Sequence, residues 1–416
     1  MEARARNFAD SSPQPCPRRT REHWRCHVQK VAQWKSCPAD QQPTWPDTGV
    51  LWQVHDELRE SPALVRGSDV RTLRTLLARV AAGELQVIQT GDCAEDPAEA
   101  TPGHVARKTA LLDVLAGVMK ARSHKPVIRV GRLAGQFGKP RSNPTEVIDG
   151  VELPVYRGHM VNSPEPDPEL RRPDPKRLLS GYRAAADVAA LLGWFDDGGQ
   201  SPVDAPVWTS HEALLLDYEA AMLRTEPDGS QLLTSTHWPW IGERTRRLDG
   251  AHVAFFAALA NPVAVKVGPT MTPEALLELC ERLDPEHEAG RLTLISRMGA
   301  GKAAERLPAL VRAVRAAGHP VIWLVDPMHG NTVSTPHGFK TRYVETVVQE
   351  VREFQAAVLD NGGVAGGIHL ETTPDDVYEC VQDASRACEI GDRYTSYCDP
   401  RLNPAQAFDV VSAWYA

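Results

Sequence analysis

The chain has 416 residues, of which 42% are hydrophobic and 24% charged, a balance that can bury the large core of an ordinary soluble enzyme. Its formal net charge of −8 provides no overall attraction for nucleic acid or an anionic membrane, so we expect neither as a partner. No apolar run approaches the roughly 20 residues of a membrane span, and the N-terminal residues lack the apolar segment of a signal peptide. We therefore expect a cytoplasmic location. The eight cysteines form no CxxC pair and no closely spaced disulfide framework, so most are expected to be reduced and buried.

Residues 1–50 are predicted to form an irregular N-terminal arm. They are rich in Pro, Arg, Gln and Cys and include two tryptophans, so we expect the arm to fold partly against the body. Two amphipathic helical patterns follow at 55–61 and 68–84, and Gly83 is placed to cap the second helix. Residues 51–416 are predicted to form a single catalytic domain.

Charged or metal-binding residues follow short apolar runs throughout the rest of the chain. The runs and residues are 85–90 before Cys93, 127–130 before Arg132, 206–210 before Glu212, 232–236 before Glu243 and Arg244, 263–268 around Lys266, 292–296 before Arg297, 321–326 before His329, and 366–370 before Glu371. Helical patterns at 272–283, 304–318 and 341–360 alternate with the later runs, as βα repeats require. Because a parallel barrel carries its catalytic groups at the C-terminal ends of its strands, this distribution predicts an α/β fold, a (β/α)8 TIM barrel.

Residues 139–205 form a long passage between the second and third predicted strands. The passage contains a Pro-rich stretch at 163–177 and a helical pattern at 177–195. An excursion of this length inside a compact domain is more often an active-site cover or a contact between subunits than a floppy linker. We expect one of these two roles.

Four residues have the chemistry of a metal site: Cys93, His329, Glu371 and Asp399. A thiolate, an imidazole and two carboxylates suit Mn, Fe, Co or Zn better than Mg or Ca, which prefer oxygen ligands alone. Taken singly, each residue is more often a core thiol, a hydrogen-bonded imidazole or a solvated carboxylate than a ligand. The barrel would bring the first three to one rim, at the ends of strands one, seven and eight, with Asp399 in the loop beyond.

A second set is basic and consists of Arg132, Lys139, Arg141, Arg244, Lys266, Arg297 and Lys340. Lys266 and Arg297 fall within or at the end of apolar strands, where an unpaired cation is costly, so a bound anion is the simplest way to stabilise them. The alternative is a salt bridge to a barrel carboxylate such as Glu243 or Glu212. Two anion sites would suit two phosphorylated substrates, because Arg binds phosphate and carboxylate bidentately.

Nine sequence blocks together resemble one enzyme family. They read QTGDCAE (89–95), GRLAGQFGKPRS (131–142), SHEALLLDYE (210–219), WIGERTR (240–246), VKVGP (265–269), ISRMGAGK (295–302), WLVDPMHGNT (323–332), GGIHLETT (366–373) and YCDPRLNPAQ (397–406). In this order, over nearly all the chain from about residue 45, they resemble type II 3-deoxy-D-arabino-heptulosonate 7-phosphate (DAHP) synthase. The chain resembles a short form of that family, because its N-terminal arm does not match the family's N-terminal regulatory elements.

The resemblance implies a metal-dependent transferase of the shikimate pathway. Such an enzyme condenses phosphoenolpyruvate (PEP) with D-erythrose 4-phosphate and water to give DAHP and phosphate. The implied ligands of one divalent metal ion, Mn or Co with Zn or Fe as alternatives, are Cys93, His329, Glu371 and Asp399. The implied PEP residues are Arg132, Lys139, Glu243, Lys266 and Arg297, and the implied erythrose 4-phosphate residues are Arg141, Ser142, Arg244 and Lys340.

The residue types also suggest roles in the reaction. The candidate catalytic residues are Lys139, Glu243, Lys266 and His329. Glu243 is the candidate for orienting the attacking water, and either Lys139 or a metal-bound water would protonate the new alkoxide. His329 needs a hydrogen-bond acceptor that fixes its tautomer, and Asp326 is the candidate. The position of Cys398 beside Asp399 leads to the hypothesis of a disulfide with Cys93 in metal-free, oxidised protein, and the alternative is a buried thiol.

Three other functions remain open at this point. The first is an amino-DAHP synthase-like enzyme of antibiotic biosynthesis, which uses an imino or amino analogue of erythrose 4-phosphate. The second is a metal-dependent aldolase or isomerase on the same barrel, which would leave Lys266 and Arg297 without a purpose. The third is a non-catalytic regulatory partner, for example of a chorismate mutase. The resemblance also favours a homo-oligomer, a dimer or a tetramer.

Overall fold

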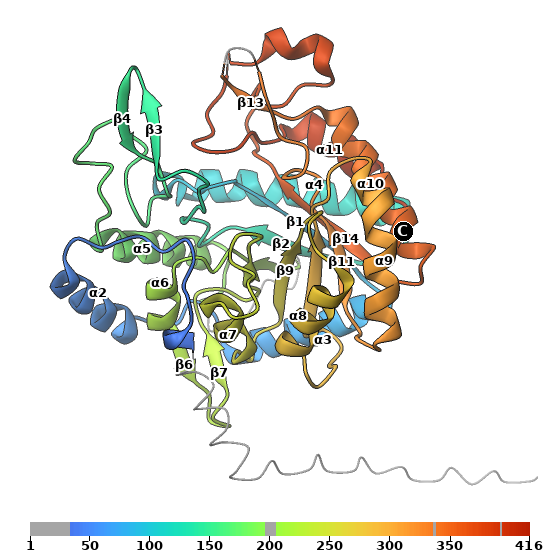
Figure 1. Cartoon of the computed structure of the whole chain (residues 1–416), viewed down its shortest axis with the longest axis horizontal. Helices are drawn as coiled ribbons and strands as arrows, with labels where there is room; N and C mark the ends of the chain where they lie inside the picture. Colours follow the sequence, from blue (N-terminus) through green and yellow to red (C-terminus); the bar gives the residue numbers. More distant parts are fainter. Residues whose placement is uncertain (1–33, 196–204, 336–337, 392) are drawn as a thin grey trace, which may run out of the picture.

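The computed structural model describes residues 34–195, 205–335, 338–391 and 393–416. Its centre is a barrel of eight parallel strands (Figure 1). In chain order the strands are β1 (Gln86–Gly91), β2 (Val127–Arg132), β5 (Val207–Thr209), β8 (Trp240–Ile241), β9 (Val263–Val267), β10 (Leu292–Ser296), β11 (Ile322–Val325) and β14 (Ala365–Glu371). Each strand pairs with its neighbours along the chain, β14 returns to β1, and a parallel bridge between Glu212 and Trp240 joins β5 to β8. The predicted (β/α)8 barrel is confirmed.

The fourth barrel strand lies later in the chain than predicted. The apolar run at 232–236 predicts this strand, but β8 occupies the position in the barrel. Instead, β7 (Gln231–Leu233) pairs antiparallel with β6 (Leu223–Thr225). A Pro-Asp-Gly sequence joins the two strands, and Gly229 within it has a φ of 79°, which suits a tight turn. The start of the apolar run that was predicted to be a barrel strand therefore belongs to a local hairpin.

Helices surround the barrel and connect its strands (Figure 1). They are α2 (Thr48–Glu60), α3 (Gly67–Ala81), α4 (Pro102–Ser123), α5 (Lys176–Leu191), α6 (Leu216–Ala221), α7 (Ala251–Ala257), α8 (Pro273–Leu283), α9 (Lys302–Ala316), α10 (Val344–Leu359) and α11 (Pro404–Ser412), with short 3-10 helices η1 (Trp34–Ser36), η2 (Pro97–Glu99) and η3 (Ala384–Glu389). The patterns that predict α8, α9 and α10 lie within three residues of the observed ends. After α3, Gly83 has a φ of 76° and donates its N–H to the Val80 carbonyl, so its predicted capping role is confirmed.

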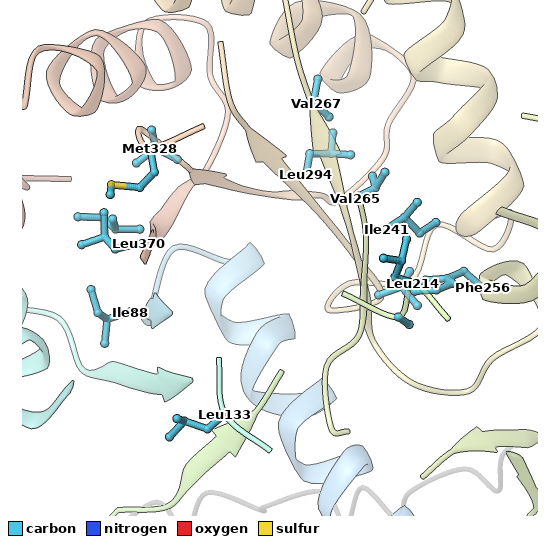
Figure 2. Packing of buried hydrophobic residues seen from close by; sticks show 14 of the residues in the cluster. Ile88, Leu133, Leu214, Ile241, Phe256, Val265, Val267, Leu294, Met328 and Leu370 are labelled. Carbon is cyan, nitrogen blue, oxygen red and sulfur yellow. The ribbon is translucent and has the colours of Figure 1, made fainter. Parts of the chain in front are cut away.

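Alternation along the strands separates the core into two layers. Successive residues of a strand face opposite sides of the sheet. One buried cluster contains Val87, Val130, Ala264, Ile295 and Leu324 together with Leu73, Leu77 and Val80 of α3. The other contains the alternate residues, such as Ile88, Val265, Leu294 and Leu370, and packs against the surrounding helices (Figure 2). The first cluster therefore fills the barrel interior, and α3 covers the end at which the strands begin.

The long passage between the second and third barrel strands is present as predicted. It contains α5 and a hairpin of β3 (Thr145–Ile148) and β4 (Val151–Pro154). This hairpin and the hairpin of β12 (Val333–Ser334) with β13 (Lys340–Thr341) lie on the upper side of Figure 1, whereas β6 and β7 lie on the lower side. Residues 196–204 of the passage lie outside the described residues.

The part of the predicted arm that the structure describes contacts the body. Trp34 packs edge-on against Phe255 with ring centroids 5.5 Å apart, and the Gln42 side chain donates a hydrogen bond to the Leu214 carbonyl at 2.8 Å. Residues 1–33 lie outside the described residues. Of the described cysteines, Cys93, Cys280, Cys380 and Cys398 are buried, and each is a free thiol. None of the described helices combines the length and the apolar character that a membrane crossing needs.

Candidate active site

The ends of the barrel strands direct polar side chains toward the barrel axis. Because side chains alternate, Arg132 faces the same side as Val130, and Lys266 faces the same side as Ala264, and both apolar partners belong to the interior cluster. Glu371, the last residue of β14, is fully buried. The sequences of β2 and β9 therefore place an apolar residue deep in the barrel and a charged residue two positions later, at the C-terminal rim.

A cavity of about 450 Å³ opens at this rim. Of the predicted site residues, it is lined by Arg132, Lys139, Arg141, Ser142, Glu243, Arg244, Lys266, Arg297, His329, Lys340 and Asp399. The two remaining predicted residues, Cys93 and Glu371, are completely buried and contact the floor of the cavity through Asp399 and His329. The structure thus brings the whole predicted set together.

Cys93, Glu371 and Asp399 can hold a metal ion. One ligand atom from each lies within 4.8 Å of the others. The loop that carries Asp399 is fixed beside β14 by a parallel bridge between Thr372 and Leu402, and the Asp399 backbone N–H donates to the Cys93 sulfur at 3.2 Å. A sulfur and two carboxylates form a mixed donor set that suits a first-row transition metal.

His329 lies at the edge of this group. Its Nε2 is 3.2 Å from an oxygen of Glu371, and its Nδ1 is 2.7 Å from Asp326 Oδ2. Asp326 is therefore the partner that sequence reasoning expected for His329. With Nδ1 held by a carboxylate, Nε2 is the nitrogen that remains for a ligand on the Glu371 side.

Burial and neighbouring charges set the ionisation of the metal-binding group. Burial raises the pKa of the Cys93 thiol well above its ordinary value, and the Cys398 and Glu371 side chains act in the same direction. Burial alone would also raise the pKa of Glu371, but the charges of His329, Arg342 and Lys139 hold it well below the ordinary range. The carboxylate is thus charged at neutral pH, whereas the thiol needs a cation to lose its proton.

Lys266 is paired inside the protein, although with a different carboxylate from those expected. Its Nζ donates to Asp326 Oδ2 at 2.6 Å, so the alternative of a salt bridge to a barrel carboxylate is confirmed, with Asp326 in place of the two examples Glu243 and Glu212. The binding of an anion at Lys266, which also lines the cavity, stays a prediction. Burial lowers the pKa of Lys266 to about 8 despite the opposing charge of Asp326. Arg297, the other strand-end cation, donates from Nη2 to the His329 carbonyl at 3.1 Å.

Arg132 and Lys139 contact the carboxylates of the metal-binding group. Arg132 Nη2 donates to Glu371 at 3.0 Å, and the guanidinium lies 5.3 Å from the centre of the Trp240 ring. Lys139 Nζ is 3.4 Å from Asp399 Oδ2 and 3.9 Å from Glu371 Oε1. Burial alone would lower the pKa of Lys139, but these charges and Cys93 raise it, so Lys139 carries a positive charge beside the metal-binding group.

The residues predicted to bind erythrose 4-phosphate lie toward the outer part of the cavity. Arg244 Nη2 donates to the Ser142 hydroxyl at 2.8 Å, which joins two members of that set. Arg141 is 3.4 Å from Glu146 of β3. Lys340 Nζ donates to Asp399 Oδ1 at 2.9 Å, so this member of the set contacts the metal-binding group directly.

Sequence reasoning missed Arg342 and the burial of Glu212. Arg342 is fully buried, and its Nη1 is 2.8 Å from Glu371 Oε2. It stands between a short strand and α10, where no apolar run marks a barrel strand, so no signal in the sequence identifies it. Burial raises the pKa of Glu212, and its Oε1 has no hydrogen-bond partner among the described residues. Its place just after an apolar run is the signal that could have included it in the site.

Comparisons with known proteins identify the family of this chain. A model of the class-II DAHP synthetase family matches residues 29–207 and 196–413. A probable phospho-2-dehydro-3-deoxyheptonate aldolase of Pseudomonas fluorescens is 57% identical over 381 residues, with 91% of this chain and 95% of the relative covered. Phospho-2-dehydro-3-deoxyheptonate aldolase of Streptomyces coelicolor is 40% identical over 426 residues, with the same shares covered.

A solved structure supports the fold alone. It is that of phospho-2-dehydro-3-deoxyheptonate aldolase from Francisella tularensis, which superimposes with a TM-score of 0.51 at 14% identity and covers 90% of this chain and 98% of its own. The family match and the two relatives, in contrast, span nearly the whole chain and include every strand end that lines the cavity. The chain therefore belongs to the class-II DAHP synthetase family.

Proposed function

We propose that this protein is a DAHP synthase, which condenses PEP with D-erythrose 4-phosphate and water to give DAHP and phosphate. In this reaction C3 of PEP bonds to the aldehyde carbon, a water oxygen adds at C2, and phosphate leaves by cleavage of its bond to C2. The observation that carries the proposal is the joint position, in one cavity, of a mixed S/N/O metal-binding group and two sets of cations. Family membership supports the same reaction.

The inner cations would bind PEP. Arg132 and Lys266 belong to β2 and β9, Arg297 directly follows β10, and all three line the cavity. They would hold the carboxylate and phosphate of PEP in a fixed orientation, which makes the encounter with the aldehyde effectively unimolecular. Glu243 would orient the attacking water, because its Oε2 is buried without a hydrogen-bond partner among the described residues.

The outer residues would bind the phosphate of erythrose 4-phosphate. Arg141, Ser142, Arg244 and Lys340 offer a hydroxyl and three cations within one region of the cavity wall. This arrangement would place the aldehyde toward the metal-binding group. Lys139, beside Asp399, is the side chain best placed to donate a proton to the new alkoxide.

Cys93, His329, Glu371 and Asp399 would hold one divalent metal ion, with Mn or Co expected and Zn or Fe as alternatives. When bound, such an ion supplies Lewis-acid polarisation of the aldehyde oxygen. The role of the protein is to hold the four ligands through the partners described above. Asp326 fixes the His329 ring, and Arg342 and Arg132 hold Glu371.

We further propose a homo-oligomer, a dimer or a tetramer, in which the β3–β4 hairpin contributes to the contact. Two apolar residues of this hairpin are highly exposed, Val147 at 70% and Val151 at 52%. Light scattering with size-exclusion chromatography would measure the mass, and Val147→Lys should reduce it. The predicted chorismate mutase partner has no feature among the described residues that supports it and stays a prediction.

The first experiment would measure phosphate release from PEP and erythrose 4-phosphate by EDTA-stripped protein, with and without Mn or Co. Mass spectrometry would detect the seven-carbon product in parallel. The proposal expects product only when metal is added. If protein that binds both metal and PEP gives no product, the acceptor is wrong, and the imino analogue of erythrose 4-phosphate becomes the substrate to test.

A further inference from the structure

A second cluster of ligand-type side chains lies at the opposite end of the barrel. Glu281 is near the end of α8, His287 is in the segment between α8 and β10, and His319 is in the segment between α9 and β11. One ligand atom from each lies within 4.8 Å of the others. Because the two histidines precede their strands, the cluster is at the end where the strands begin, away from the cavity at the C-terminal rim.

The distances within the cluster match those around a metal ion. Nε2 of His287 is 3.3 Å and Nε2 of His319 is 3.2 Å from the same oxygen of Glu281. Tetrahedral zinc with bonds of about 2.0–2.1 Å separates its ligand atoms by about 3.3–3.4 Å. The two imidazole rings are stacked, with centroids 3.9 Å apart and planes inclined by 21°, so both rings present the same edge to Glu281.

Hydrogen bonds within the protein do not satisfy this arrangement. His319 is only 5% exposed, and neither of its ring nitrogens has a hydrogen-bond partner among the described residues. Its Nε2 is 3.2 Å from an oxygen of Glu281, a contact that becomes an ion pair only when the ring is protonated. Burying an imidazole nitrogen without a hydrogen-bond partner is destabilising, and a metal ion bound at Nε2 would remove this cost for that nitrogen.

The surroundings favour a neutral His319 beside negative charge. His287 Nδ1 is 3.4 Å from the Gly318 carbonyl, the type of contact that fixes the tautomer of a ligating histidine and leaves Nε2 for the metal. Burial lowers the pKa of His319, and the charge of His287 acts in the same direction. The Asp284 carboxylate interacts with both histidines and has one buried oxygen without a hydrogen-bond partner among the described residues.

We propose that Glu281, His287 and His319 bind a second divalent transition-metal ion of the zinc type. Two imidazoles and a carboxylate form a borderline donor set that favours Zn²⁺ over Mg²⁺ or Ca²⁺. The ion links the segment before β10 to the segment before β11. Because Glu281 is exposed, a water molecule can take the remaining coordination position of the ion. Its role is to stabilise the end of the barrel that carries no catalytic residues.

Cobalt titration of metal-free protein distinguishes the two sites. A Co²⁺ ion bound to Cys93 gives an intense thiolate-to-metal absorption band, whereas a site with nitrogen and oxygen ligands gives only weak visible bands. We expect wild-type protein to bind two equivalents and to show the thiolate band for one of them. Cys93→Ala should lose that band and keep the second, weakly absorbing equivalent.

Two variants remove the proposed site, and a third variant serves as the control. Glu281→Gln should lose the second equivalent and keep the thiolate band, which shows that the protein is folded. His287→Asn should do the same, and Asn suits the left-handed backbone at this position, where φ is 50°. Glu286→Gln, an exposed neighbour outside the cluster, should still bind two equivalents.

Two results would overturn the proposal. One is a wild-type protein that binds only the equivalent with the thiolate band. The other is an unchanged second equivalent in both Glu281→Gln and His287→Asn. Neither result depends on turnover, so failure of this site and failure of the proposed DAHP synthase activity are distinguishable.

Discussion

Asp326→Asn should shift the pH dependence of PEP use, because the Asp326 carboxylate keeps Lys266 charged. Asp326 Oδ2 accepts a hydrogen bond from Lys266 at 2.6 Å and lies 2.7 Å from His329 Nδ1. Burial lowers the pKa of Lys266 to about 8, and Asp326 is the strongest influence in the opposite direction. Asn keeps the shape of the side chain but removes the charge that favours the protonated amine.

The size of the shift follows from the strength of this contact. A hydrogen bond to a charged group contributes about 1.5–3 kcal/mol, and about 1.4 kcal/mol corresponds to one pKa unit. The pKa of Lys266 should therefore fall by about 1–2 in the variant. At pH 7.5 the charged fraction would fall from about three-quarters to between about 24% and 3%, so kcat/KM for PEP should decrease about 3- to 25-fold. Because Lys266 is charged below its pKa, the loss should diminish as the pH is lowered toward 6.

Steady-state kinetics between pH 6 and 9 would measure this shift, since kcat/KM reports ionisations of the free enzyme. The assays need saturating metal, because His329 also loses a partner and its metal affinity is expected to fall. Asp249→Asn is a matched control, as Asp249 is an exposed acid paired with Arg247. An equal loss at every pH, with the basic limb of the profile unmoved, would refute the assignment of Lys266 as the group that Asp326 keeps charged.

Three further outcomes follow from contacts of the metal-binding group. Arg342→Met removes the 2.8 Å partner of the fully buried Glu371 but leaves its contact with Arg132, so the metal-free protein should lose about 1.5–3 kcal/mol in its free energy of unfolding by urea; a loss under 1 kcal/mol would contradict this. Metal-stripped, oxidised protein should yield a Cys93–Cys398 peptide in non-reducing mapping, and its absence would remove the disulfide hypothesis. Metal-loaded protein should bind PEP about 5- to 150-fold more tightly than metal-free protein in calorimetric titrations.

The sequence predicted which side chains lie together at the rim, because the barrel converts position along a strand into position in space. Every barrel strand ends at the same rim, so a charged residue after each apolar run is enough to identify a shared location. Lys266 illustrates the limit of this reasoning. Its strand position predicted that it faces the cavity. Its partner Asp326 directly follows β11, which is two strands away from β9 around the barrel. No local sequence pattern encodes that contact.

Features that depend on connections between strands could not be predicted. The 232–236 run has the composition of a barrel strand, and only the competing partner at 223–225 removes it from the barrel. Glu281, His287 and His319 were missed for a related reason. Each stands in a polar helix end or connection, where such residues are common, and their proximity arises from the packing of adjacent βα units.

The charge pattern of the cavity explains why metal and PEP should bind cooperatively. In the described structure, Arg132 pairs with Glu371, while Lys139 and Lys340 pair with Asp399. A divalent ion on the same carboxylates would neutralise their charge and weaken these pairs, and the released cations would then favour an anion. Because coupling between two ligands is reciprocal, PEP should strengthen metal binding by the same factor. Equal PEP affinity with and without metal would mean that the ion pairs between these carboxylates and cations persist after the metal binds.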